Sequence, residues 1–369
     1  MKKTPERSFL FPVFIFISLA LLTVAILASC EATPLSGGWQ DAGIVKDDVG
    51  STTAPPSTTE PPLTTAPPTT TAPVTTAPPV TTAPEVLYYN PLTGLPCGRT
   101  EAEARPLALC VKQASAGKIA AQDLVIEAAT EGRTTRLALL SCGGTQSFDA
   151  QIISSTRPYL ATVSNDFFGI SVFRGTSDNS FATTDFLFDT LDLSKNTVTT
   201  REEFSSLLTS SGYQTSISGS IALPYRLSEI AEVIKPQTMR SSYVSIPFHS
   251  DTATSFTYDT VRGAYTMRSG SPLLSDGSEL PTFKNLLVLF HDATRRVTKD
   301  GVELSMDTAL GGQGYYFTEG GAVPIFWRRD PITSALRLTD TDGGELTVNR
   351  GKTYIAMTTY EYRDQMIMN

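Results

Sequence analysis

Two glutamates and four arginines are the side chains of this 369-residue sequence best suited to chemistry. They are Glu127, Glu131, Arg133, Arg136, Arg157 and Arg174. Arginine side chains can hold a carboxylate or phosphate through two parallel hydrogen bonds, and a pair of carboxylates is the minimum requirement for glycoside hydrolysis. The alternative is that Glu127 or Glu131 pairs with Arg136 across a β-hairpin and only stabilises the fold. The sequence therefore predicts a polar cluster that binds a ligand, performs acid–base chemistry or holds a hairpin together.

Residue types that mark common catalytic or metal sites are few. The only histidines are His249 and His291, and the chain has no G-x-S-x-G segment, no H-E-x-x-H segment and no cysteine pair at metal-ligand spacing. His291 ends an apolar run before Asp292, so we expect it to face solvent at a turn. We expect no metal and no cofactor.

Three cysteines, Cys97, Cys110 and Cys142, follow an earlier one at Cys30. Small buried thiols are the favoured interpretation, because cysteine is among the most buried residue types. A disulfide between Cys110 and Cys142 is the alternative, since both end neighbouring strand candidates. A nucleophilic thiol is disfavoured, because neither histidine is close in sequence.

The predicted strands and helices that position these residues all lie after Val86 in the sequence. Short apolar runs predict strands at 106–111, 123–128, 135–140 and 169–173, and further strands from about residue 243 onward. Helices are predicted from Pro158, after the capping box of Thr200 and Glu203, and over 225–234. We therefore predict an α+β fold, with a mixed α/β domain over 85–240 and a mainly antiparallel β domain over 241–369.

The N-terminal residues have the features of an export signal. Lys2, Lys3 and Arg7 precede an apolar stretch over residues 9–28, which ends at Leu27-Ala28-Ser29-Cys30. This ending resembles the lipobox of bacterial lipoproteins, which implies removal of residues 1–29 and attachment of diacylglycerol to the thiol of Cys30. An uncleaved transmembrane helix is the alternative, because about 20 apolar residues can span a bilayer. In either case we expect the rest of the chain outside the cytoplasm.

Residues 30–84 are expected to form a stalk. From Ser51 to Pro84 the chain consists almost wholly of Thr, Pro and Ala, which cannot form a core. Proline at this density favours polyproline II, which would extend this stretch to about 100 Å. That length suits a spacer through a cell wall, as in a Gram-positive bacterium, and a flexible linker without a length requirement is the alternative.

The order of several short motifs resembles a family of bacterial lipoproteins, the YerB-like group with a domain of unknown function, DUF3048. The motifs are Asn90-Pro-Leu-Thr-Gly-Leu-Pro96, Gln122-Asp-Leu-Val-Ile-Glu127, Glu131-Gly-Arg-Thr-Thr-Arg136, Ser155-Thr-Arg-Pro-Tyr159, Phe256-Thr-Tyr-Asp259 and Gly351-Lys-Thr-Tyr-Ile355. The resemblance runs from Asn90 to about Thr358. It implies a two-part fold and a surface location, and no reaction.

This chain departs from the family pattern at two places. Ser154 stands where the family commonly has a second arginine. Ser194-Lys195-Asn196 stands where relatives usually carry Pro-His-Asn, so Lys195 and Asn196 are candidate ligand-binding residues in place of that histidine. The chain therefore resembles a divergent member.

These observations favour a non-catalytic surface module that binds a cell-wall polymer or an envelope protein. Its expected patch is Glu127, Glu131, Arg136 and Arg157, its membrane partner is the bilayer that holds acylated Cys30, and the net charge of −8 disfavours nucleic acid. The first alternative is a cell-wall hydrolase or transferase with a glutamate as general acid or base. The second is a purely structural surface protein.

Overall fold

The computed structural model describes residues 87–143, 148–175, 189–217, 219, 221–298 and 301–369. These residues all lie in one compact unit. The predicted signal sequence, Cys30 and the stalk lie outside the described residues. Within the described residues no helix is long and apolar enough to cross a membrane.

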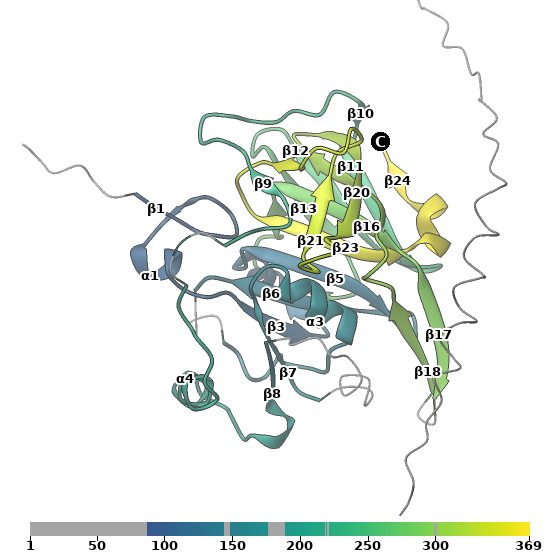
Figure 1. Cartoon of the computed structure of the whole chain (residues 1–369). Helices are drawn as coiled ribbons and strands as arrows, with labels where there is room; N and C mark the ends of the chain where they lie inside the picture. Colours follow the sequence, from purple (N-terminus) through teal and green to yellow (C-terminus); the bar gives the residue numbers. More distant parts are fainter. Residues whose placement is uncertain (1–86, 144–147, 176–188, 218, 220, 299–300) are drawn as a thin grey trace, which may run out of the picture. The chain divides into compact units, whose positions relative to one another are not determined.

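A large sheet forms the centre of the described unit (Figure 1). Its strands, in spatial order, are β10 (Met239–Arg240), β20 (Gly321–Arg329), β19 (Gly312–Thr318), β16 (Asn285–His291), β23 (Thr353–Thr359), β5 (Leu124–Thr130), β6 (Thr134–Ser141), β3 (Leu107–Val111), β7 (Ile170–Phe173) and β8 (Thr190–Asp192). The short strand β21 (Leu336–Thr339) pairs with β20. Because β23 pairs in parallel with β5, the sheet continues across the predicted boundary near residue 240.

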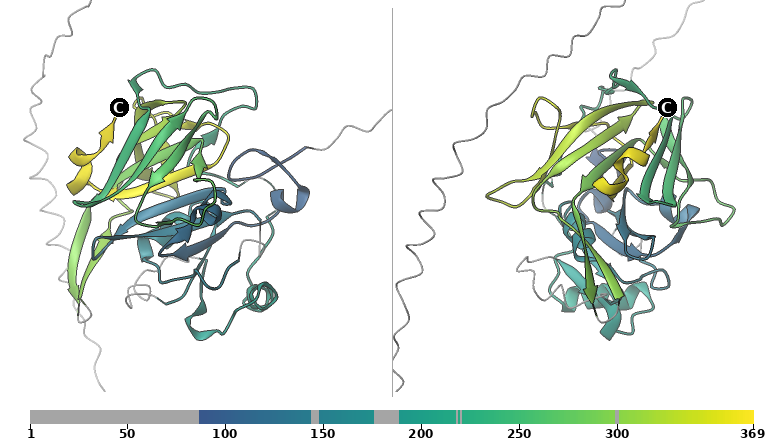
Figure 2. Two further views of the ribbon diagram at one scale, coloured as in Figure 1. Left: turned by 180° about the vertical axis from the view of Figure 1, so that it is seen from behind. Right: turned by 90° about the vertical axis from the view of Figure 1, so that its right-hand side faces the viewer.

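The central strands β5, β16 and β23 are buried along their whole length, because both faces of the sheet are covered. A five-stranded sheet covers one face. It consists of β15 (Thr282–Phe283), β13 (Ala264–Ser269), β12 (Thr252–Asp259), β11 (Tyr243–His249) and β24 (Ile367–Met368). Aromatic rings join the two sheets, as where the Phe256 ring lies 4.8 Å from that of Tyr354. Figures 1 and 2 show helix α3 on the side of the large sheet away from this second sheet.

The helices are short and follow local signals. They are α1 (Arg99–Ala102), α2 (Ala116–Ala120), α3 (Pro158–Asn165) and α4 (Arg201–Ser210), with 3₁₀ turns η3 (Leu193–Lys195) and η4 (Tyr360–Gln365). The predicted capping box is confirmed, because Thr200 accepts from the backbone of Glu203 and the Glu203 side chain accepts in return. Pro158 opens α3 as predicted.

Two predictions need correction. The fold is mostly β-sheet with few helices, so the α+β prediction gave too much weight to helices in the first half. The helix predicted over 225–234 is wrong, because this segment contains a short strand and a turn but no helix. It contains β9 (Arg226–Leu227), which pairs in parallel with β22 (Thr347–Val348). Farther along, the Asn349 side chain bonds to both the N–H and the C=O of Ile234. These partners are more than 100 residues away and supply the hydrogen bonds that a helix would have made internally.

Three further pairs of strands complete the fold. They are β1 (Tyr88–Tyr89) with β2 (Pro96–Cys97), β4 (Ala114–Ser115) with β14 (Leu273–Leu274), and the hairpin of β17 (Ala293–Thr298) and β18 (Gly301–Met306). The hairpin projects from the body of the unit (Figure 2). Strands β1 and β9 contribute residues to the cleft described below.

Candidate functional site

Glu127 is completely buried between the two sheets. Its Oε2 atom accepts hydrogen bonds from the hydroxyls of Thr254, at 2.9 Å, and Tyr354. Burial raises the pKa of Glu127 from 4.5 to about 7, and the hydroxyl hydrogen bonds only partly oppose this rise. A carboxyl with this pKa has the protonation behaviour of a general acid, but the side chain is sealed from solvent on β5.

Glu131 follows β5 at the hairpin turn and forms an ion pair with Arg157. Both Nε and Nη2 of Arg157 donate to its carboxylate, and Nη1 donates to the Thr156 carbonyl at 3.0 Å. The Arg157 side chain is only 6% exposed. The pairing of Glu127 or Glu131 with Arg136 that was considered from sequence is therefore not present, because the partner of Glu131 comes from the start of α3.

The other predicted arginines contact backbone carbonyl groups. Arg136 donates to the Thr135 carbonyl at 3.2 Å, and its half-buried guanidinium has its pKa lowered by burial. Arg174 donates to the carbonyls of Leu193 and Val198, and so fixes the turn after β8. Arg174 therefore stabilises the conformation of this turn.

Lys195 and Asn196 lie at the end of η3, where the backbone N–H of Asn196 bonds to the Leu193 carbonyl. Lys195 is exposed and Asn196 is half-buried. Neither residue lines either of the two cavities described below. The same holds for Glu127, Glu131, Arg136, Arg157 and Arg174.

Both histidines are buried, so the prediction that His291 faces solvent is wrong. Its ring lies 4.3 Å from that of Trp327 on β20, and its Nδ1 lies 2.8 Å from the Asp307 carbonyl. Burial lowers the pKa of His291 to about 4. His249 contacts the Thr134 carbonyl through Nε2 at 3.1 Å. Each histidine thus packs in the interior against a distant strand that sequence alone did not reveal.

The three described cysteines are free thiols, and Cys110 and Cys142 are buried. The favoured interpretation of buried thiols is confirmed for these two, and the Cys110–Cys142 disulfide is not formed. Burial raises the pKa of Cys110 to about 12, which opposes nucleophilic use. Within the described part of the chain, no group of three or more His, Cys, Asp or Glu side chains could hold a metal ion.

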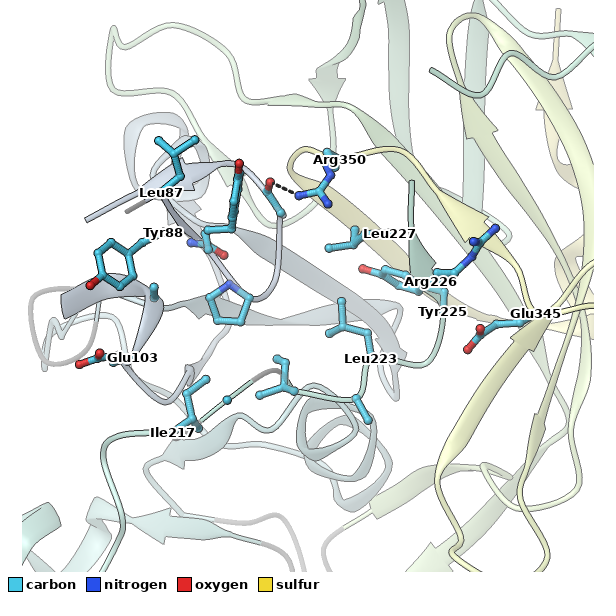
Figure 3. Close-up of a pocket in the computed structure, with 18 of the residues that line it drawn as sticks. Leu87, Tyr88, Glu103, Ile217, Leu223, Tyr225, Arg226, Leu227, Glu345 and Arg350 are labelled. Atoms are coloured by element: carbon cyan, nitrogen blue, oxygen red, sulfur yellow. Dashed lines mark hydrogen bonds between the residues drawn. The ribbon is translucent and has the colours of Figure 1, made fainter. Parts of the chain in front are cut away.

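One hollow is a cleft of about 630 Å³, well within the range of small-molecule sites (Figure 3). Its lining comes from described residues within 87–103 and within 217–227, together with Arg337, Glu345 and Arg350. Its apolar lining comes from Leu87, Tyr88, Tyr89, Pro91, Ile217, Ile221, Leu223, Tyr225 and Leu227. We call this hollow the arginine cleft, because Arg226, Arg337 and Arg350 also line it.

One wall of the arginine cleft is the Asn90–Pro96 motif. The buried Asn90 side chain accepts from the N–H groups of Leu92 and Thr93 and fixes a tight turn. Gly94 has a φ of +67°, and a Cβ there would lie 2.9 Å from a guanidinium nitrogen of Arg350. That nitrogen instead donates to the Gly94 carbonyl at 2.6 Å, the contact drawn as a dashed line in Figure 3. The motif is therefore a preformed wall fixed by Arg350.

None of the three arginines that line the cleft is ion-paired within the described residues. Arg350 donates to the carbonyls of Ser228 and Gly94 and lies 5.4 Å from the Tyr89 ring centroid. Arg226 donates to the Thr347 hydroxyl at 3.0 Å. Neutral carbonyl and hydroxyl groups satisfy these donors without cancelling their charge, so the cleft keeps a positive potential.

Two glutamates also line the cleft. Glu103 forms an ion pair with Arg99, and Glu345 is the second acid of the lining, labelled in Figure 3. Sequence reasoning did not identify Arg226, Arg337, Arg350 or Glu345, because Arg226 lies more than 100 residues before the other three and no spacing rule links them. The available signal was the Asn90–Pro96 motif, which was noted but not assigned to a site.

A second hollow of about 440 Å³ lies beside α2 and is polar. Its Lys118 and Asp149 form an ion pair, and Asp123 accepts from the backbone N–H of Cys142 at 2.8 Å. These charged groups already have protein partners, so this hollow offers a ligand fewer free charges than the arginine cleft does.

Comparisons with known proteins support the predicted resemblance. Residues 244–355 match the family described as "Protein of unknown function (DUF3048) C-terminal domain". The crystal structure of YerB protein from Bacillus subtilis has a similar fold, with a TM-score of 0.57 and 21% sequence identity over 76% of this chain and 99% of that chain. A comparison with the curated proteins finds no match. The resemblance is confirmed, and the first matched residue lies close to the predicted boundary near residue 240.

Proposed function

We propose that this chain, whose residues 244–355 match the DUF3048 C-terminal domain and whose fold is similar to that of YerB, is a membrane-anchored surface lipoprotein that binds a ligand in the arginine cleft. The cleft carries the proposal. It combines a preformed wall, an apolar lining and arginines without ion-pair partners. These are the features of a small-molecule site, in which apolar surface gives affinity and a few polar groups give orientation.

The cleft supports ligand binding better than the predicted Glu–Arg cluster does. In that cluster Glu131 is paired with Arg157, and Glu127 is sealed between two sheets. A ligand there would have to displace a buried ion pair, which costs several kcal/mol. The proposed site therefore lies in the same unit but at a different place from the patch expected from sequence.

Binding in the cleft is tested with N-phenyl-1-naphthylamine, an uncharged dye that fluoresces in apolar surroundings. The protein is the full chain after residue 29, carrying Cys30→Ser. We expect the wild-type cleft to bind the dye and Ala222→Trp to abolish binding, because Ala222 is an exposed lining residue and an indole there fills the space. Ala309→Trp, at an exposed position that does not line the cleft, is the matched control and should bind normally. Equal dye binding by wild type and Ala222→Trp would refute the site.

The anchor is tested separately. In a bacterial host with lipoprotein processing, wild type should incorporate labelled palmitate and Cys30→Ala should not, because the thiol of Cys30 is the proposed attachment point. A Cys30→Ala protein that remains full-length and membrane-bound would contradict the lipid anchor and favour a transmembrane helix.

A further inference from the structure

Two arginines face each other on neighbouring strands at the edge of the large sheet. In the antiparallel pair of β20 and β21, Arg328 lies directly opposite Arg337. Residues in such positions have Cβ atoms about 5 Å apart and share one face of the sheet. Like charges placed directly opposite each other destabilise a sheet, so this pair opposes folding. A local arrangement that costs stability without a visible structural gain is a frequent mark of function.

No acidic side chain in the described residues forms an ion pair with Arg328 or Arg337. The side chains of Arg328 and Arg337 make no ion pair and no hydrogen bond within the described residues. The charge of Arg337 helps to lower the pKa of Asp330. The Asp330 carboxylate, however, already accepts hydrogen bonds from the backbone N–H groups of Ile332 and Thr333. The side chains of Arg328 and Arg337 therefore share one face of the sheet with their donors available.

One member of the pair, Arg337, lies in the arginine cleft, and Arg328 lies opposite it on β20 outside the lining. The N–H of Leu338, on the same strand as Arg337, bonds to the Pro224 carbonyl at 2.8 Å. That bond fixes β21 beside the segment that carries Leu223 and Leu227. Phe326, two residues before Arg328 and therefore on the same face of β20, is 42% exposed. An anionic group held by Arg337 would thus lie at the edge of the apolar lining of the cleft.

We infer that the arginine cleft takes a single amphiphilic molecule that carries a phosphate or carboxylate on an apolar body, with Arg328 and Arg337 holding the anionic group. This inference rests on the proposed function, because it names the ligand class for the same site. Guanidinium groups suit these anions, since each can donate two parallel hydrogen bonds. The lining contains three arginines, Arg226, Arg337 and Arg350, and the negative charge of Glu345 offsets only part of their positive charge. The cleft volume of about 630 Å³ suits one small molecule.

Displacement of N-phenyl-1-naphthylamine by octyl phosphate and by octanol tests this inference, because the two competitors share one tail and differ in the head group. Octyl phosphate should displace the dye from the wild-type protein at a concentration roughly tenfold lower than octanol does. Charge-assisted hydrogen bonds are worth at least a factor of ten in affinity. In the double variant Arg328→Gln/Arg337→Gln the ratio should fall to about two or less. Arg240→Gln/Arg268→Gln removes the same charge from exposed positions outside the cleft and should keep the wild-type ratio.

The outcomes separate this inference from the proposed function. A wild-type protein that does not bind the dye refutes the site itself. Dye binding with equal displacement by octyl phosphate and octanol, or an unchanged ratio in Arg328→Gln/Arg337→Gln, overturns only the anionic ligand class.

A vesicle arm tests the source of the anionic group. Vesicles of phosphatidylglycerol should bind no better than vesicles of phosphatidylcholine, because the site is a cleft for one molecule. Binding to phosphatidylglycerol vesicles that is lost in Arg328→Gln/Arg337→Gln, without displacement of the dye by octyl phosphate, would assign the arginines to a bilayer surface and overturn the inference.

Discussion

The Glu–Arg cluster around Arg157 and the arginine cleft use the same residue types in opposite ways. In the cluster, Arg157 has a carboxylate partner and is almost fully buried. In the cleft, Arg226 and Arg350 bond only to neutral groups, and Arg337 lies opposite another arginine. Buried charges need partners to be tolerated, whereas exposed charges can remain unpaired and available. The presence of charged residues in a motif is therefore a weaker guide to a ligand site than the absence of their counter-charges.

The largest expected effect concerns Glu127, the most buried acid of the Glu–Arg cluster. Because its folded pKa is about 7 against 4.5 for an exposed glutamate, the folded protein holds the proton more tightly than the unfolded chain. The resulting stabilisation is complete below about pH 4.5, declines as the pH rises and is lost above pH 7. Urea unfolding should show wild type losing about 3 kcal/mol relative to Glu127→Gln between pH 4.5 and pH 8.

The exposed Glu279→Gln is the control and should follow the wild-type curve. His291, whose pKa is lowered to about 4, adds a separate loss of stability as the pH falls from 6.5 toward 4, and this loss is common to all three proteins. Parallel curves for wild type and Glu127→Gln would show that Glu127 is hydrated and would weaken the contrast with the cleft.

The second effect concerns the Glu131–Arg157 ion pair of the Glu–Arg cluster. Glu131→Ala leaves the Arg157 guanidinium buried without a counter-charge, so we expect the free energy of unfolding to fall by about 2 kcal/mol. Asp251→Ala removes the acid partner of the exposed Arg133 and is the matched control, with an expected change within about 0.5 kcal/mol. Equal losses for the two variants in urea unfolding would contradict the view that the cluster is structural.

The smallest effect concerns Arg337 in the arginine cleft, where we expect the substitution to raise the free energy of unfolding instead of lowering it. Arg337→Glu replaces a like-charge pair on β20 and β21 with an opposite-charge pair, which should raise the free energy of unfolding by about 0.5 kcal/mol. Arg268→Glu, on an exposed part of β13, controls for the change in net charge. A loss of stability in Arg337→Glu would show that the arginine pair serves the fold.

Local features of the fold could be predicted from sequence, and long-range ones could not. The capping box at Thr200 and the helix start at Pro158 depend on residues within four positions, and both are confirmed. The segment at Arg226 was predicted as a helix and contains a short strand and a turn instead, because its partners Thr347 and Asn349 come from the other end of the chain. His291 was predicted to be exposed and is buried, because Trp327 packs against it from another strand.

The candidate site follows the same rule. Glu131 and Arg157 were recognised as a charged group, but their pairing required knowledge of where α3 begins relative to the β5–β6 turn. The Arg328–Arg337 pair depends on the register of β20 and β21 across an irregular loop, which residue patterns do not determine. The Asn90–Pro96 motif was visible in the sequence, but its role as a cleft wall required Arg350.

The most direct test of the contrast between the two regions is a crystal structure of the full chain after residue 29, with Cys30→Ser, bound to octyl phosphate. We predict the phosphate within hydrogen-bonding distance of Arg328 and Arg337, the alkyl chain against Leu223 and Leu227, and the Glu131–Arg157 pair intact. A phosphate bound at Arg136 or Arg157, with Glu131 displaced, would contradict the account and return the ligand site to the Glu–Arg cluster.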